Sequence, residues 1–295
     1  MNMAYTEETA PFTCQGEPLL GIVARPELAA SVGVVVIVGG PQYRAGSHRQ
    51  FVLLSRALAQ SGVAVLRFDY RGMGDSGGEL RDFEAVSGDV GAAIDALQRA
   101  VPTVKRIALW GLCDGASAAL MYCHETGDPR VAGLCLLNPW VRSEASLART
   151  QVKHYYVQRL LQPAFWAKLL RGGVALKALG GLAANLQVAL FGAPTPVAGQ
   201  SVAKGKTHSA APFQTQMAES WNNFPGPICL ILSGDDYTAK EFLEHLAQEK
   251  PWGGAMKHPR LARHDLPDAD HTFSGQEDRQ AAEALTLAWL HKALR

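Results

Sequence analysis

Short runs of consecutive apolar residues alternate along this chain with longer segments whose apolar residues recur at helical spacing. Strands buried on both faces of a sheet are continuous apolar runs, whereas a helix that covers a sheet carries one apolar stripe. The pattern predicts, in order, strand 33–38, helix 51–60, strand 63–68, helix 83–100, strand 106–110, helix 116–124 and strand 131–137. Such an alternation is typical of an α/β fold with a mostly parallel central sheet flanked by helices.

Both ends of the chain extend this sheet. Residues 10–14 and 18–24 are β-like runs separated by the turn signal Gln15-Gly16, which predicts an antiparallel hairpin at the sheet edge. Towards the C-terminus, 228–232 and 261–266 read as two further strands, and 278–294 reads as the last helix.

About eighty residues without a strand signal separate the predicted strands 131–137 and 228–232. A connection of that length inside a sheet is far longer than an ordinary loop, so an inserted helical cap is expected. The predicted organisation is therefore a core formed by 1–140 and 222–295, with a cap insertion at 141–221.

Composition places the chain among ordinary globular proteins, with 47% hydrophobic and 19% charged residues. The net charge of +1 does not favour nucleic-acid binding by the whole chain. Five cysteines without C-x-x-C spacing predict neither a disulfide framework nor a zinc site, and favour a reducing compartment. The acidic N-terminus lacks the features of a secretory signal, and no transmembrane segment is expected, so we expect a cytoplasmic protein.

A cysteine lies in a G-x-S-x-G-like motif at the predicted end of strand 106–110, as Gly111-Leu112-Cys113-Asp114-Gly115. This motif is typical of a sharp strand-to-helix turn that exposes a nucleophile above a sheet. A helix N-terminus and a neighbouring imidazolium stabilise the thiolate form of a cysteine, so Cys113 is expected to be an activated nucleophile. Cys123, Cys135 and Cys229 lie inside apolar runs and are expected to be structural.

An acid and a histidine follow Cys113 along the chain. Enzymes whose nucleophile lies in such a strand-to-helix turn have the same order of nucleophile, acid and histidine. Ser233-Gly234-Asp235-Asp236 comes directly after the strand 228–232, and we favour Asp236 as the acid while Asp235 stays an alternative. His271 stands after the last predicted strand and before the last helix, where the base belongs. The expected chemistry is attack of a thiolate on a carbonyl to form an acyl-thioester, which water or another acceptor resolves.

The oxyanion of such a reaction needs two N–H donors. One is expected from Asp114, and the other from the loop after strand 33–38, where Pro41 has no N–H and Gln42 or a neighbouring amide is the candidate. The Tyr43 hydroxyl is a further possibility there. Tyr43, Trp140 and Tyr156 are the candidates for substrate contacts.

Two further patterns point to other chemistry and are set aside. Gly72-Met73-Gly74-Asp75-Ser76-Gly77 fits G-x-G-x-x-G, but the acidic residue that a dinucleotide site needs about 20 residues on would fall inside a helix. The histidines and acids between His264 and His271 match no metal-ligand spacing. No cofactor and no metal are expected.

Residues 63–78 resemble the strand-and-turn signature of lipase, esterase and aminopeptidase-like α/β-hydrolases. The whole chain is similar to the first of two hydrolases associated with exosortase A systems in bacteria, in the segments 38–44, 46–49, 67–76, 111–115, 153–156 and 233–242. The resemblance implies the α/β-hydrolase fold and a genomic setting of exopolysaccharide export and protein sorting, with no known substrate. By its chemistry alone, Cys113 also resembles the nucleophile of cysteine acyltransferases such as polyhydroxyalkanoate synthases and bile-acid conjugating enzymes.

The predicted cap is strongly basic. Between 141 and 210 nine Lys or Arg residues stand against one acid, Glu144, which makes +8 and leaves −7 for the rest of a chain of net charge +1. Apolar residues recur at helical spacing in the same segment, beginning at Tyr156. We expect this cap to meet an anionic amphiphile, such as a lipid-linked substrate or a membrane surface, while a structural cap stays an equal alternative.

Together these patterns predict a hydrolase that acts on an ester or thioester of a small-molecule acyl substrate through a Cys113-His271-Asp236 triad. An acyltransferase or a peptidase of the same fold stays open as an alternative. So does a catalytically idle protein that binds a ligand or partner.

Overall fold

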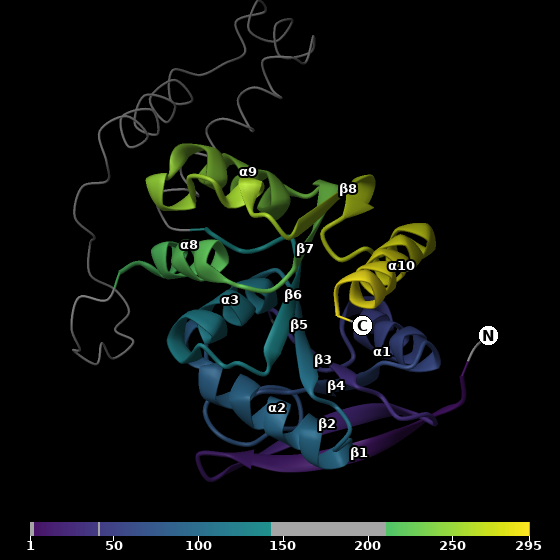
Figure 1. Ribbon diagram of the computed structural model, residues 1–295. Coiled ribbons are helices and arrows are strands. Elements are labelled where there is room, and N and C mark those ends of the chain that lie inside the picture. The colour runs from purple at the N-terminus through teal and green to yellow at the C-terminus, as the bar shows by residue number, and fades with distance from the viewer. Residues whose placement is uncertain (1–2, 41, 143–210, 295) are drawn as a thin grey trace, which may run out of the picture. The chain divides into compact units, whose positions relative to one another are not determined.

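Six parallel strands make up most of one sheet, and they include the apolar runs predicted from the sequence (Figure 1). The computed structural model describes residues 3–40, 42–142 and 211–294. Over these residues the sheet has eight strands in the order β1-β2-β4-β3-β5-β6-β7-β8. The strands are β1 (Tyr5–Cys14), β2 (Glu17–Pro26), β3 (Val32–Ile37), β4 (Ala64–Phe68), β5 (Arg106–Leu112), β6 (Val131–Leu137), β7 (Ile228–Asp235) and β8 (Leu261–Asp270).

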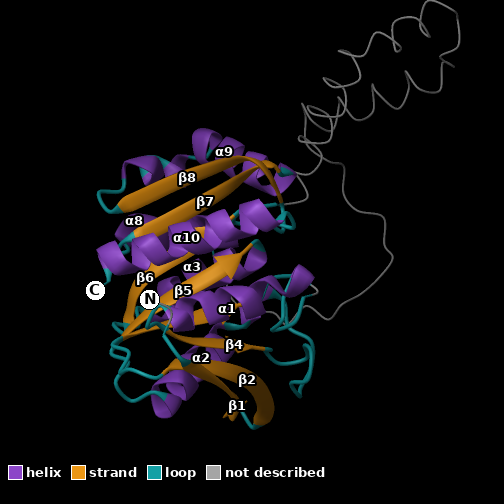
Figure 2. Ribbon diagram, turned by 90° about the vertical axis from the view of Figure 1, so that its right-hand side faces the viewer, coloured by secondary structure: helices purple, strands orange, loops and turns teal. Residues whose placement is uncertain are grey.

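Helices cover both faces of this sheet. They are α1 (Gln50–Gln60), α2 (Ser87–Ala100), α3 (Asp114–Thr126), α8 (Phe213–Asn223), α9 (Tyr237–Gln248) and α10 (Gln276–Ala293). α1 and α10 lie on one face, and α2, α3 and α8 lie on the other (Figures 1 and 2). Every residue of β3 and β4 is buried, which explains why these strands read as unbroken apolar runs.

The predicted core fold is confirmed. β1 and β2 pair antiparallel at the sheet edge, as the turn signal predicted, and β2 joins the parallel strands by pairing antiparallel with β4. The predicted helix 83–100 divides into a 3-10 turn, Phe83–Ala85, followed by α2. Because β3 to β8 are parallel, their carboxyl ends meet at one edge of the sheet, which brings together the segments that follow them.

The boundary of the predicted cap differs from the observed division of the chain. The chain separates into two units, one of Met1–Val141 with Ala211–Arg295 and one of Arg142–Ala210. Residues 211–221, which the sequence analysis assigned to the cap, therefore belong to the core unit and form most of α8. Apart from 141 and 142, the basic segment lies outside the described residues, so its predicted helices stay a prediction.

Aromatic packing explains why α8 belongs to the core. Trp221 of α8 is fully buried, and its ring centroid lies 6.1 Å from that of Phe242 and 5.9 Å from that of Trp252. Phe242 and Trp252 also meet edge to face at 5.6 Å. Large rings in such arrangements contribute much of the apolar area that a core buries. The lack of a strand signal had hidden this helix within the predicted cap.

Candidate active site

Cys113 occupies the sharp turn between β5 and α3. Its φ of 60° and ψ of −126° are unfavourable for a residue with a side chain. Two glycines make room for this turn: a Cβ on Gly111 would lie 2.3 Å from the carbonyl oxygen of Gly115, and a Cβ on Gly115 would lie 2.4 Å from that of Ile37. The turn leaves Cys113 partly exposed at the N-terminus of a helix. This is the geometry that the G-x-S-x-G-like motif predicts.

Asp236 and His271 meet at the carboxyl ends of β7 and β8. His271 Nδ1 lies 2.8 Å from Asp236 Oδ2. The carboxylate is 6% exposed, and it also accepts the backbone N–H groups of Thr238 at 2.9 Å and Ala239 at 3.2 Å. Asp235 is exposed, so of the two acids left open by the sequence only Asp236 contacts the histidine. A carboxylate in this position holds the imidazole in one orientation.

The side chain of Cys113 lies close enough to the imidazole of His271 to raise its pKa, so the three predicted residues lie together. The hydrogen bond to Asp236, followed by the interaction with Cys113, raises the pKa of His271 from 6.5 to about 10, and burial opposes this rise. An imidazolium at this position stabilises a neighbouring thiolate.

Replacing Asp236 by asparagine is expected to lower the free energy of unfolding by an amount that shrinks as the pH rises. The pKa of His271 is higher in the folded protein, about 10, than its ordinary value of 6.5. The bound proton therefore stabilises the fold fully below the ordinary value, and this contribution is lost as the pH rises through the folded value. Urea unfolding of both proteins at about pH 6 and about pH 10.5 measures the difference.

The control for this experiment is Asp235→Asn, which removes the adjacent exposed carboxylate. It is expected to show no such pH dependence. Asparagine caps helices about as well as aspartate, so Asp236→Asn keeps the cap of α9 and reports on the imidazole pair. An equal loss of stability at both pH values would contradict the interpretation.

A buried amide that the sequence analysis missed holds the histidine loop. Asn138, fully buried after β6, donates from Nδ2 to Ser233 Oγ at 2.9 Å and to the carbonyl of His271 at 3.3 Å. Its Oδ1 accepts the Ser233 N–H at 2.9 Å, and Ser233 Oγ donates to the carbonyl of Asp270 at 2.9 Å. These bonds tie the ends of β6, β7 and β8 together. A polar residue directly after a buried strand was the only sequence signal for this network.

The Asp114 carboxylate fixes the loop after β3 against the nucleophile turn. Asp114 Oδ1 accepts the N–H of Gly40 at 2.6 Å. Burial raises the pKa of Asp114, while backbone hydrogen bonds, first from Gly40, oppose the rise. The predicted oxyanion donor Asp114 is the first residue of α3, next to Cys113. The N–H of Gly40, on the facing loop, already donates its hydrogen bond to the carboxylate of Asp114.

A buried ion pair holds the same loop from its other side. Arg44 forms an ion pair with the fully buried carboxylate of Asp69, which directly follows β4, and its backbone N–H donates to Asp69 at 2.6 Å. Arg44 also pairs with Asp75 at 2.6 Å, and the Asp75 N–H donates to Asp69 at 3.1 Å. The loops after β3 and β4 are thereby coupled, which the sequence analysis did not foresee.

The remaining predicted site residues differ in their burial and in the groups that they contact. Gln42 is half-buried, and its side-chain oxygen accepts the Ser47 N–H at 3.3 Å. Tyr43 is 51% exposed, and its ring lies 5.8 Å from the Arg44 guanidinium carbon. The Trp140 N–H donates to the Cys113 carbonyl at 3.3 Å, which places this residue beside the nucleophile turn. Tyr156 lies outside the described residues.

The G-x-G-x-x-G-like stretch packs closely against Asp69, which forms the ion pair with Arg44. Gly74 has φ 53°, and a Cβ there would lie 2.2 Å from Asp69 Oδ2, so only glycine fits against this carboxylate. Within the described ranges, no cluster of three or more His, Cys, Asp or Glu side chains could hold a metal ion. None of the helices that the structure describes is long and apolar enough to cross a membrane.

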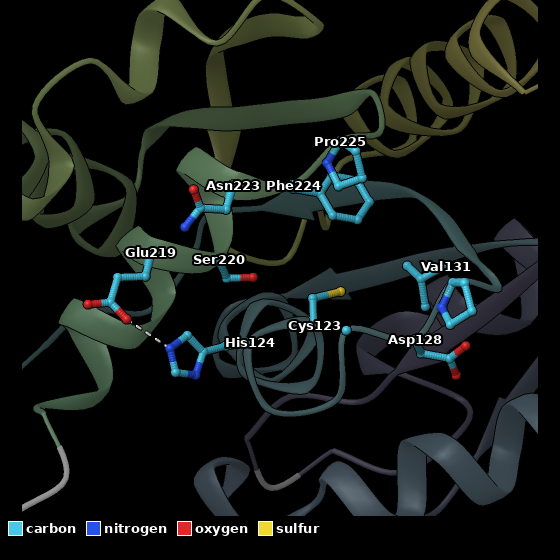
Figure 3. Close-up of a pocket in the computed structure, with 11 residues that line it drawn as sticks. Cys123, His124, Asp128, Val131, Glu219, Ser220, Asn223, Phe224 and Pro225 are labelled. Atoms are coloured by element: carbon cyan, nitrogen blue, oxygen red, sulfur yellow. Dashed lines mark hydrogen bonds and ion pairs between the residues drawn. The ribbon is translucent and has the colours of Figure 1, made fainter.

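One cavity of about 560 Å³ adjoins the candidate site, since Gly40 and Asp114 form part of its wall. A second cavity of about 640 Å³ lies between the end of α3, the segment before β6 and the end of α8 (Figure 3). At its rim His124 and Glu219 form an ion pair of 2.9 Å. None of the three predicted catalytic residues lines either cavity, but the first cavity includes Asp114, which is next to Cys113 in the chain.

Comparison with known proteins supports the fold. The model of the alpha/beta hydrolase family matches residues 34–284, while no curated protein matches the chain. Among solved structures, an esterase from Pyrococcus furiosus superposes with a TM-score of 0.62 at 16% identity, covering 99% of this chain and 94% of that one. A dienelactone hydrolase from Anabaena variabilis gives 0.60 at 14% identity, with 99% of each chain covered. An acylaminoacyl peptidase from Pyrococcus horikoshii gives 0.60 at 14% identity, over 97% of this chain and 41% of that one.

Proposed function

Because the chain belongs to the alpha/beta hydrolase family, we propose that it hydrolyses an ester or thioester bond of a small acyl substrate. In this proposal Cys113 is the nucleophile, His271 transfers the proton and Asp236 orients His271. The observation that carries the proposal is the hydrogen bond between Asp236 and His271 beside Cys113, which lies in a strained turn at a helix N-terminus.

The proposed reaction has two halves. The Cys113 thiolate attacks the carbonyl carbon, and the carbonyl electrons move to an oxyanion that the amides of Asp114 and Gln42 stabilise. The oxyanion collapses to a thioester on Cys113, and the leaving alcohol or thiol takes the proton from His271. Water then attacks this thioester and gives a proton to His271, and the acid departs as the thiolate is restored.

A panel of three butyryl compounds tests this proposal: a nitrophenyl ester, an alkyl thioester and an anilide. The ester and the thioester are expected to be cleaved, and mass spectrometry of a quenched reaction is expected to find the butyryl group on the peptide that contains Cys113. Fragment ions of this peptide distinguish Cys113 from Cys123, which serves as the control because this thiol is on α3 and burial raises its pKa to about 12.

The other outcomes separate the alternatives. Preference for the anilide would indicate a peptidase or amidase. Faster decay of the adduct with an added amine or alcohol, with the acyl group found on it, would indicate an acyltransferase. The absence of both turnover and a covalent adduct would indicate a catalytically idle protein that binds a ligand or partner.

For the cellular setting we propose a cytoplasmic enzyme in an exosortase-linked exopolysaccharide pathway. The segments that resemble the exosortase-associated hydrolases support the pathway. The free thiols of all five cysteines agree with a reducing compartment. The basic segment 141–210 supports an anionic or lipid-linked substrate, or peripheral contact with a membrane.

A further inference from the structure

The cavity of about 560 Å³ beside the nucleophile turn is formed chiefly by the segment that follows β4. Gly40 and Asp114 line the end next to Cys113, and residues between Tyr70 and Phe83 line the rest. If the amide of Asp114 holds the carbonyl oxygen of a substrate, a chain that continues from that carbonyl has this cavity within reach. The cavity is therefore the natural place for one half of the substrate.

Arg81 is the one cation among the described residues that line this cavity. Its Nε is buried and has no hydrogen-bond partner. The two neighbouring arginines differ in this respect. Arg44 is paired with Asp69 and Asp75, and Arg71 is paired with Asp89. Of these three arginines, Arg81 alone has a buried Nε donor without an acceptor.

The acids that line the cavity are occupied elsewhere. Asp82 accepts the backbone N–H of Glu84 at 3.1 Å, and Asp114 accepts that of Gly40 at 2.6 Å. Neither forms an ion pair with Arg81. Much of the remaining wall is apolar, and it includes Met73 and Leu80. The cavity thus combines an apolar wall with one guanidinium whose Nε has no acceptor.

A guanidinium pairs best with a planar anion that accepts two parallel hydrogen bonds, as a carboxylate does. Two carboxylates already border the cavity, so a singly charged ligand meets less repulsion there than a doubly charged phosphate does. We propose that Arg81 binds a carboxylate at the far end of the substrate's acyl group, so that the preferred substrates are half-esters or half-thioesters of dicarboxylic acids. This assignment rests on the proposed hydrolase function and adds the substrate class to it.

A pair of esters that differ only in charge tests the proposal. For wild type, kcat/KM for the nitrophenyl half-ester of glutaric acid is expected to exceed that for its neutral methyl-capped form by roughly tenfold or more, the range of one charge-assisted hydrogen-bonded pair. Arg81→Gln is expected to abolish this preference by slowing the charged ester alone. Arg81→Lys, which keeps the charge, is expected to restore part of it. Lys105→Gln removes an exposed cation at the opposite edge of the sheet and is the matched control.

Three results would overturn the assignment. The first is a wild type that prefers the neutral ester, and the second is an Arg81→Gln effect of equal size on both esters. The third is a charge preference that appears only when the carboxylate is on the leaving group, as in the butyrate ester of 4-hydroxybenzoate.

Calorimetric titration with glutarate separates this proposal from the proposed function, because it needs no turnover. Cleavage of neither ester would reject the hydrolase function. Glutarate binding to wild type that Arg81→Gln weakens by roughly tenfold would still support the carboxylate site. Equal binding to both proteins, or to neither, would reject the carboxylate site.

Discussion

Cys113→Ala is expected to lower kcat for ester hydrolysis by about 10⁴-fold or more, because removal of the nucleophile of a triad leaves only binding and oxyanion stabilisation. The variant keeps the Cβ and therefore the backbone strain of the turn at φ 60°, so its unfolding midpoint is expected to stay close to that of wild type. Initial rates with nitrophenyl butyrate, together with urea unfolding, measure both quantities.

Cys123→Ala is the matched control for this variant. Cys123 is also a partly exposed free cysteine on α3, but it lines the cavity away from the candidate site. Its replacement is expected to leave kcat within about twofold of wild type, as for most substitutions away from functional groups. If Cys113→Ala retained a tenth of wild-type activity, Cys113 would not be the nucleophile.

His271→Ala is expected to lower kcat by about 10³- to 10⁴-fold and to slow the alkylation of Cys113 by iodoacetamide at neutral pH. The reason is the same for both effects. The pKa of His271 is about 10, so the imidazole holds its proton at neutral pH beside Cys113, and alanine removes both the proton carrier and the charge that favours a thiolate. Peptide mapping after timed alkylation gives the rate for Cys113 alone.

The control for the histidine is His124→Ala. His124 also forms an ion pair with a carboxylate, at 2.9 Å from Glu219, but it lies beside the second cavity. Its loss is expected to change neither the alkylation rate of Cys113 nor kcat by more than about twofold. Alkylation of Cys113 at the wild-type rate in His271→Ala would show that the imidazolium does not activate the thiol.

Local sequence was sufficient for the core fold because each element has its own periodicity. The apolar runs that became β3 and β4 are buried on both faces, and no other element type accommodates such runs so easily. The hairpin of β1 and β2 followed from a turn signal between two short runs. α8 was missed because its buried face packs against aromatic residues from distant segments, Phe242 and Trp252, which no local window contains.

The candidate site could be predicted only where the order of residues along the chain, together with the fold, determines their position. Cys113, His271 and the pair of acids follow strands that end at one edge of the sheet, so their positions were implied by the fold. The fold did not imply the choice between Asp235 and Asp236, because adjacent residues in an extended chain point to opposite sides. The structure brings Asp236 to the histidine and leaves Asp235 exposed.

By itself, then, the sequence determined the order of the strands in the core, the turn at Cys113, and Cys113 and His271 as two members of the proposed triad, with a pair of adjacent acids for the third. Only the tertiary structure decided which acid contacts His271, that Asn138 holds the histidine loop, and that Arg81 lines a cavity with a buried Nε that has no acceptor. The physical reason is the separation along the chain between the residues that interact. Periodicity and turn chemistry act over a few neighbouring residues, whereas the partners of a buried polar group come from strands that are adjacent only after the sheet has formed.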